Sequence, residues 1–158
     1  MSLRATARWR AQLAIALGMA LAFALPYLTA QVVTNQRDRQ WAESGLSAYE
    51  IDAWRDNGFG AVAEAIGWRG ARFQAPGARL WREEGWTDGR AAAAWRDANF
   101  GAREATRWRD AGFAAGVARE WATAGFLPGD ARRWRDAGVS PADAAARRKR
   151  GEGPGRQP

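Results

Sequence analysis

The chain has 158 residues, 47% of them hydrophobic, and is long enough for one modest domain. It contains no Cys and no His, and Lys149 is its only basic residue that is not Arg. Thiolate or imidazole metal sites, Ser-His-Asp triads and Cys-His nucleophiles cannot be built from such a composition. We therefore expect no metal, no cofactor and no enzymatic activity.

The net charge of +7 would suit nucleic acid or anionic lipid, but the excess lies at the two ends of the chain. Residues 1–40 carry +4 and residues 141–158 carry +3, whereas residues 41–140 hold 14 Arg and 14 acidic residues. A domain that binds nucleic acid would carry its positive charge on the folded part. We therefore expect no nucleic acid partner.

A basic flank at residues 1–10 precedes an uncharged, apolar stretch at residues 11–33. A helix of that length spans about 34 Å, which is enough to cross the hydrocarbon core of a bilayer. A buried core helix is disfavoured because the stretch has no polar face. We expect a transmembrane anchor in contact with membrane lipid, and the alternative is a signal sequence cleaved after Ala24 or before Gln31.

The charges beside this stretch predict its orientation. Arg4, Arg8 and Arg10 precede it, and Arg37 and Arg39 follow it. Short basic flanks resist translocation, so the N-terminus should stay in the cytoplasm and the rest should emerge outside. Since the Arg, Ala, Gly and Trp bias is typical of a GC-rich bacterium, we expect a single-pass protein of the cytoplasmic membrane with a periplasmic domain. Cleavage would instead give a secreted protein.

After a short linker at residues 34–40, a pattern repeats every 13 or 14 residues over residues 41–146. Each repeat has a Trp, a Gly or Asn four residues later, and then an apolar residue. The repeated Trp are Trp41, Trp54, Trp68, Trp81, Trp95, Trp108, Trp121 and Trp134. The corner residues are Gly45, Gly58, Gly85, Asn99, Gly112, Gly125 and Gly138. Arg72 alone departs from the pattern at the corner.

The spacing predicts one helix break per repeat. In a continuous helix, Trp residues 13 apart would point about 220° away from each other and form no stripe. Gly112 at C′ and Phe113 at C″ would end a helix in the ordinary way and place Phe113 on Trp108. An Ala three residues before most of the Trp, such as Ala105, shares the inward face. Where the spacing is 14, the extra residue lies between the corner and this Ala.

The sequence also predicts where several helices begin. Ser47 and Glu50 form a capping box, and Ser140 is an N-cap followed by Pro141 at the first helical position. We therefore expect an all-α protein in which an array of about eight helices of nine or ten residues follows the N-terminal transmembrane helix. The array would be solenoid-like or a compact helical repeat.

The corner resembles the Met-Gly-Phe loop of ubiquitin-associated domains, as in Gly112 and Phe113 followed by Ala118. The resemblance implies a sharp corner between two short helices. The Met that helps contact ubiquitin in that family is replaced here by Ala111, so the resemblance does not extend to the ligand.

The repeated Trp have two possible roles. They could be exposed platforms for glycans or Pro-rich peptides. We interpret them as the structural core instead, because each one is fixed by its place at a helix end. The Arg-Asp pairs that follow many of them, such as Arg96 and Asp97, are interpreted as a solvated face. A carboxylate pair for hydrolysis from Glu83, Glu84 and Asp88 is only a weak signal.

The tail at residues 147–158 starts with Arg147 in the place of a ninth Trp and is expected to be disordered. The whole chain is then a membrane-anchored, non-enzymatic protein-interaction or spacer module with an unidentified protein partner. The alternative is an exported binding module that uses exposed Trp.

Overall fold

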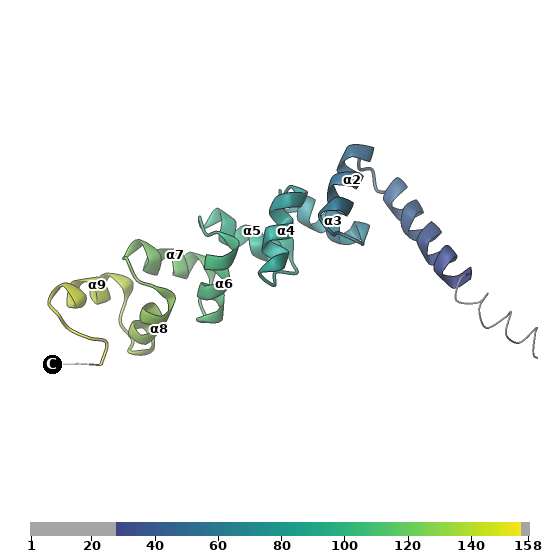
Figure 1. Cartoon of the computed structure of the whole chain (residues 1–158). Helices are drawn as coiled ribbons and strands as arrows, with labels where there is room; N and C mark the ends of the chain where they lie inside the picture. The colour runs from purple at the N-terminus through teal and green to yellow at the C-terminus, as the bar shows by residue number, and fades with distance from the viewer. Residues whose placement is uncertain (1–27, 156–158) are drawn as a thin grey trace, which may run out of the picture. The chain divides into compact units, whose positions relative to one another are not determined.

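The computed structural model describes residues 28–155, which are all-α with no strand (Figure 1). A helical segment at residues 28–42 is followed by eight short helices. These are α2 (Ala48–Asp56), α3 (Val62–Gly70), α4 (Ala75–Glu83), α5 (Gly89–Asp97), α6 (Ala102–Asp110), α7 (Ala115–Thr123), α8 (Pro128–Asp136) and α9 (Pro141–Lys149). The chain divides into two compact units between Ile51 and Asp52, and each is considered by itself.

Helix 28–42 is the main element in the described part of the first unit. Residues 34–40, predicted as a linker, are helical and lie inside this helix. The physical reason is local, because residues 34–40 contain no Gly or Pro to interrupt a helix. The predicted membrane span at residues 11–33 lies outside the described residues except for residues 28–33. Within residues 28–155, no helix is long and apolar enough to cross a membrane.

The first unit ends in a corner of the predicted kind. Trp41 is 3% exposed, and Gly45 has a φ of 73°. The capping box that begins α2 is confirmed. The backbone N–H of Ser47 donates to the Glu50 carboxylate at 2.9 Å, and the N–H of Glu50 donates to the Ser47 hydroxyl at 3.3 Å.

In the second unit, the corner after α6 shows how each helix ends. The N–H of Phe113 donates to the Trp108 carbonyl at 3.1 Å, and the N–H of Gly112 donates to the Arg109 carbonyl at 2.8 Å. With Gly112 at a φ of 81°, this is a Schellman motif. The rings of Trp108 and Phe113 meet edge to face with centroids 5.1 Å apart, which confirms the predicted contact.

The left-handed conformation recurs at every corner of the second unit. It is adopted by Gly58, Arg72, Gly85, Asn99, Gly112, Gly125 and Gly138. Arg72 keeps this geometry, with a φ of 62°, although its residue type departs from the pattern. A further corner at Gly151 follows α9, where the N–H of Glu152 donates to the Arg147 carbonyl at 3.0 Å.

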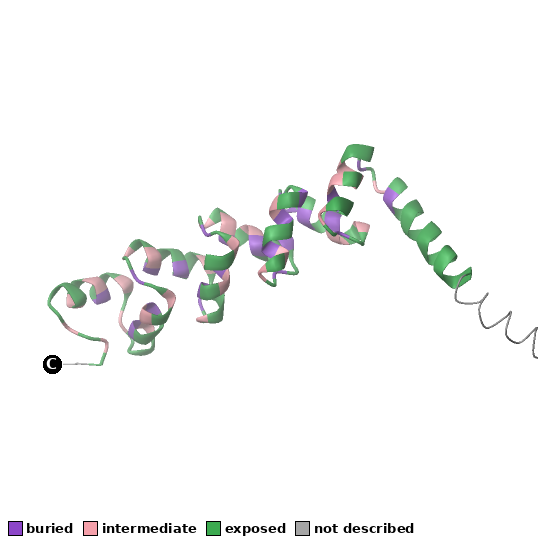
Figure 2. Ribbon diagram, in the orientation of Figure 1, coloured by how far each residue is buried: buried purple, intermediate pink, exposed green. Residues whose placement is uncertain are grey.

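The core of the second unit is built from the Trp and the small residues beside them (Figure 2). The repeated Trp of this unit are between 1% and 6% exposed. The Ala three residues before each Trp from Trp68 to Trp134, and the one at the matching place in α9, are fully buried. These are Ala65, Ala78, Ala92, Ala105, Ala118, Ala131 and Ala144, each 0% exposed. A methyl group there lets neighbouring helices approach closely, while the indoles fill the space between them.

The aromatic rings also link one unit of the array to the next. The ring centroids of Phe100 and Trp108 are 6.1 Å apart, and those of Phe113 and Trp121 are 6.4 Å apart. Similar contacts make a continuous row of rings from Trp68 to Trp134. Each repeat therefore stacks its aromatic residues on those of its neighbours, as in helical repeat proteins.

Helices also contact the helix two places away. α3 packs on α5, α4 on α6, and α5 on α7. The approach is tight at Gly89, where an added Cβ would lie 3.0 Å from the Trp68 Cα. α3 and α5 belong to the 14-residue repeats, and each begins one residue later after its corner residue than the other helices do. The extra residue therefore lies in the loop before the helix, as predicted. These contacts with the second neighbour position the surface features described below.

The C-terminal boundary also differs from the prediction. α9 continues through Lys149, so the expectation of disorder from Arg147 is wrong for residues 147–149. Ser140 caps this helix as predicted, with its hydroxyl accepting from the N–H of Asp143 at 3.1 Å. Beyond it, a hydrogen bond from Arg150 holds the pKa of Glu152 below its ordinary value.

Candidate binding site

Five arginines join units of the array that are two repeats apart. Each follows the Trp position of its helix, and its guanidinium lies over the aromatic ring that follows the corner two units earlier. We call these contacts arginine bridges. They are Arg82 over Phe59, Arg96 over Phe73, Arg109 over Trp86, Arg135 over Phe113 and Arg148 over Phe126, with 4.1 to 4.6 Å between the guanidinium carbon and the ring centroid.

Most bridges also hydrogen-bond to the corner backbone. Arg135 donates to the Gly112 carbonyl at 2.8 Å, and Arg82 donates to the Gly58 carbonyl at 3.0 Å. Arg148 reaches two carbonyls, those of Gly125 and Ala124, at 2.9 and 3.0 Å. These carbonyls end a helix and lack helical partners, so they attract a cation.

The bridges correct the interpretation of the Arg-Asp pairs as a solvated face. Asp136 does receive a hydrogen bond from Arg135, at 3.0 Å, and Asp97 receives one from Arg96, at 2.9 Å. The arginine is nevertheless shared between that Asp and a ring and carbonyl 22 to 25 residues earlier. The Asp therefore steadies a guanidinium whose main contacts are between units.

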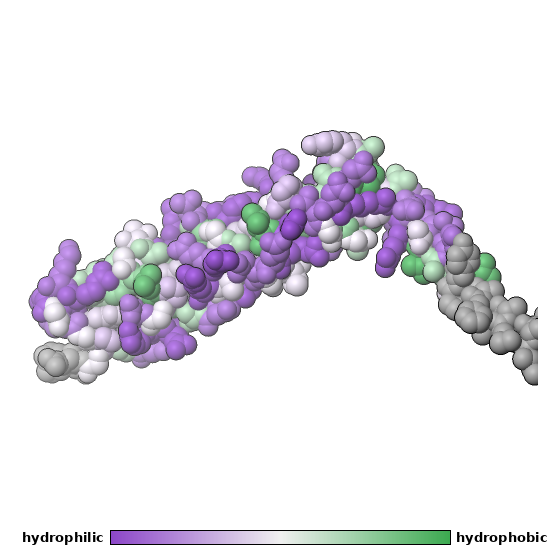
Figure 3. Space-filling view, viewed as in Figure 1, coloured by the Kyte–Doolittle hydropathy of each residue, from purple (hydrophilic) through white to green (hydrophobic). Residues whose placement is uncertain are grey.

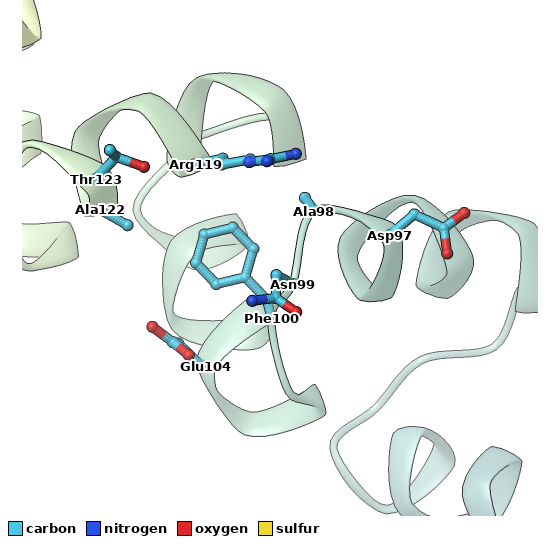
Figure 4. Close-up of a pocket in the computed structure, with 8 residues that line it drawn as sticks. All are labelled: Asp97, Ala98, Asn99, Phe100, Glu104, Arg119, Ala122 and Thr123. Atoms are coloured by element: carbon cyan, nitrogen blue, oxygen red, sulfur yellow. The ribbon is translucent and has the colours of Figure 1, made fainter.

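The bridge is missing at one place. The residue after Trp121 is Ala122, so the ring of Phe100, two units earlier, has no guanidinium over it within the part of the chain that the structure describes. An open pocket of about 530 Å³ occupies this place (Figure 4). Its lining residues are Asp97, Ala98, Asn99, Phe100, Glu104, Arg119, Ala122 and Thr123.

The partners of a bridge remain in this pocket. Phe100 supplies the ring, and the corner at Ala98 and Asn99 supplies the terminal carbonyls of α5. Glu104 corresponds to Glu64, since each lies one residue before the buried Ala of its helix. In the complete bridge, Glu64 pairs with Arg82 at 3.0 Å. The pocket thus has a ring, carbonyls and a carboxylate in the arrangement that holds a guanidinium elsewhere.

The residues singled out by the sequence lie elsewhere or have other partners. The Trp of the period are buried, so no indole face of the array is available for stacking within residues 28–155. Glu83 pairs with Arg79 at 2.7 Å, and Glu84 pairs with Arg103 at 3.1 Å. Asp88 caps α5 by accepting from the N–H of Arg90 at 2.8 Å. These carboxylates do not converge on a site.

Trp86 has a specific arrangement in its Phe position. Its indole N–H donates to the Thr106 hydroxyl at 2.9 Å, and this hydroxyl lies 3.2 Å from the Glu84 carbonyl. A buried indole N–H usually has such a partner, although that of Trp68 has none in the described part of the chain, whereas Phe has no N–H to satisfy. In this unit Arg109 contacts the Trp86 ring and Asp110, but within residues 28–155 it donates no hydrogen bond to a carbonyl of the corner.

The surface seen in Figure 3 is mostly hydrophilic, with a few apolar side chains scattered over it. The exposed large apolar side chains of the second unit include Leu80, Val117 and Leu127. Within residues 28–155 there is no cluster of three side chains that could hold a metal ion. These features define a class of protein, a tandem array of nine-residue helices with aromatic corners. No family model, no curated protein and no solved structure matches this chain.

Proposed function

We propose that this protein is a membrane-anchored helical-repeat protein whose array serves as a non-enzymatic protein-interaction or spacer module. The observation that carries the proposal is how the aromatic side chains are used. The Trp and the rings at the corners pack against each other, and exposed ion pairs such as Arg79 with Glu83 lie on the surface. Such a repeat presents a regular surface on a core that needs only its neighbours.

The interaction role is supported by the single interruption of the bridges at Phe100. A pure spacer has no need of an open corner lined by Asp97, Glu104 and a ring face. The alternative of a module that binds glycans or Pro-rich peptides through Trp is disfavoured, because the repeated Trp are at most 6% exposed.

The membrane part of the proposal rests on the sequence of residues 1–40. We propose an anchor at residues 11–33, the N-terminus in the cytoplasm and the array in the periplasm. Protease added to spheroplasts should digest the array while the protein withstands a carbonate wash. Full protection would place the array in the cytoplasm, and release by the wash would favour a cleaved signal sequence.

Site-specific crosslinking tests the interaction role. A photoreactive amino acid is placed in living cells at exposed positions around the array, for example at Leu80, Val117, Thr123 and Leu127. An interaction module should give a discrete adduct from a contiguous set of positions. A spacer should give no adduct at any position, and this result would remove the interaction role while leaving the anchor intact.

A further inference from the structure

We propose that the pocket at Phe100 receives an arginine side chain from a partner protein, which completes the bridge that this chain leaves open. The inference deepens the proposed interaction function and rests on it. It names the recognised group as a guanidinium and the recognising groups as the Phe100 ring, the corner carbonyls and Glu104.

The first argument is the precedent within the chain. Five guanidinium groups occupy the equivalent positions, and the contact at Phe59 has all three kinds of partner. Arg82 lies 4.3 Å from the Phe59 ring centroid, 3.0 Å from the Gly58 carbonyl oxygen and 3.0 Å from the Glu64 carboxylate. The recurrence shows that this geometry selects a planar cation with several donors, which describes Arg better than Lys.

The second argument is the state of the pocket itself. Ala122 ends at its Cβ and cannot reach the ring or the carbonyls, so the space that a bridge would fill is open to solvent. The C-terminal end of α5 and the carboxylate of Glu104 contribute negative charge to this place, and Arg119 contributes one positive charge. The volume of about 530 Å³ has room for the end of one long side chain.

Arg119, which lines the pocket from α7, does not take the missing position. It makes no hydrogen bond or ion pair within residues 28–155. Three residues separate it from Ala122, which is about 4.5 Å along a helix axis. Because helical side chains lean toward the N-terminus, its guanidinium starts about one turn too far back. In the view of Figure 4 its side chain extends above the Phe100 ring in the direction of Ala98, and within residues 28–155 no hydrogen bond or guanidinium–ring contact joins it to the corner.

We assign the arginine that would fill the pocket to a partner protein because of the charge distribution of this chain. The array is neutral, and its bridging arginines are already engaged in contacts within the chain. A partner that presents one arginine from an exposed segment would meet a ring, a carboxylate and two free carbonyl ends together. This contact would place the partner at one defined position along an otherwise regular array.

The test is an NMR titration of the full chain in detergent micelles with N-acetyl-arginine amide. The citrulline analogue, which has the same shape without the charge, is the control ligand. We expect saturable shifts at the amides of Asn99, Phe100, Glu104 and Thr123 with the arginine compound only. Glu104→Gln should weaken binding about tenfold, since a charge-assisted contact is lost.

Two matched arginine variants sharpen this test. Ala122→Arg supplies the missing bridge from within and should abolish binding of the arginine compound. Val117→Arg adds the same charge to an exposed position of α7 outside the pocket and should bind as the wild type does. Equal binding by wild type and Ala122→Arg would overturn the proposal, as would equal shifts with the citrulline analogue.

Three further outcomes would also overturn it. Binding that appears only in Arg119→Ala would assign the pocket to the internal Arg119. Self-association in sedimentation that Ala122→Arg abolishes would make a second copy the occupant. A crosslinked partner whose yield is unchanged in Ala122→Arg would leave the interaction function standing and remove this pocket from it.

Discussion

Two corners of the array, at Phe59 and at Phe100, have the same kinds of bridge partner but differ in the residue that lies two units later. Both have a buried ring, a left-handed corner residue and a Glu before the buried Ala of the next helix. At Phe59 the residue two units later is Arg82, and at Phe100 it is Ala122. The ring at Phe100 is 6% exposed and the ring at Phe59 is 1% exposed. The comparison teaches that the core holds without the bridge, which frees one corner for another use.

The largest effect is expected from Trp108→Ala, because this substitution removes packing from both the open corner at Phe100 and a bridged corner. Trp108 lies 6.1 Å from Phe100 and 5.1 Å from Phe113, so it supports the open corner and a bridged corner together. Truncating a Trp that is 1% exposed should cost about 3 to 5 kcal/mol of unfolding free energy. Chemical denaturation followed by circular dichroism measures this loss. A loss below about 1 kcal/mol would mean that the indole is not part of the core.

Gly112→Val should have the next largest effect on stability, because it strains the backbone of a bridged corner. Gly112 has a φ of 81°, and a Cβ would lie 3.6 Å from a terminal nitrogen of Arg135. A β-branched residue there should cost at least about 1 to 2 kcal/mol from the backbone alone. Asn99→Gly, at the open corner, is the matched control and should change the denaturation midpoint little. An unchanged midpoint in Gly112→Val would contradict the helix end assigned here.

The corners and the core could be predicted from the sequence because their causes are local. A Gly four residues after a Trp favours the end of a helix, and this helix end places Phe113 on Trp108 within the same repeat. The limits of the terminal elements were harder to predict. Residues 34–40 and 147–149 are polar, but nothing in them breaks a helix.

The arginine bridges could not be predicted in the same way. They join atoms 22 to 25 residues apart, and this proximity arises from the way helices two places apart approach each other, as α3 and α5 do. One signal was present in the sequence. Arg follows the Trp in six of the eight repeats, and among the repeats that have a partner ring two units earlier only Ala122 interrupts this rule.

A smaller effect is expected from the bridges themselves. Arg135→Ala removes a contact with the Phe113 ring and the Gly112 carbonyl, and it should cost about 1 kcal/mol because the guanidinium is partly exposed. Arg109→Ala removes a ring contact without a corner carbonyl and should cost about half as much. Denaturation midpoints of the two variants give the comparison. Equal losses would show that the corner carbonyl contributes nothing.

The most direct measurement of the central claim, that the corner at Phe100 is a bridge without its arginine, is a double-mutant cycle between Ala122→Arg and Phe100→Leu. Ala122→Arg alone should raise the unfolding free energy by about 0.5 to 1 kcal/mol, and Val117→Arg should not. The gain should disappear in the Phe100→Leu background, giving a coupling energy of about 0.5 kcal/mol or more. A gain that is the same with Phe and Leu at this position would contradict the claim.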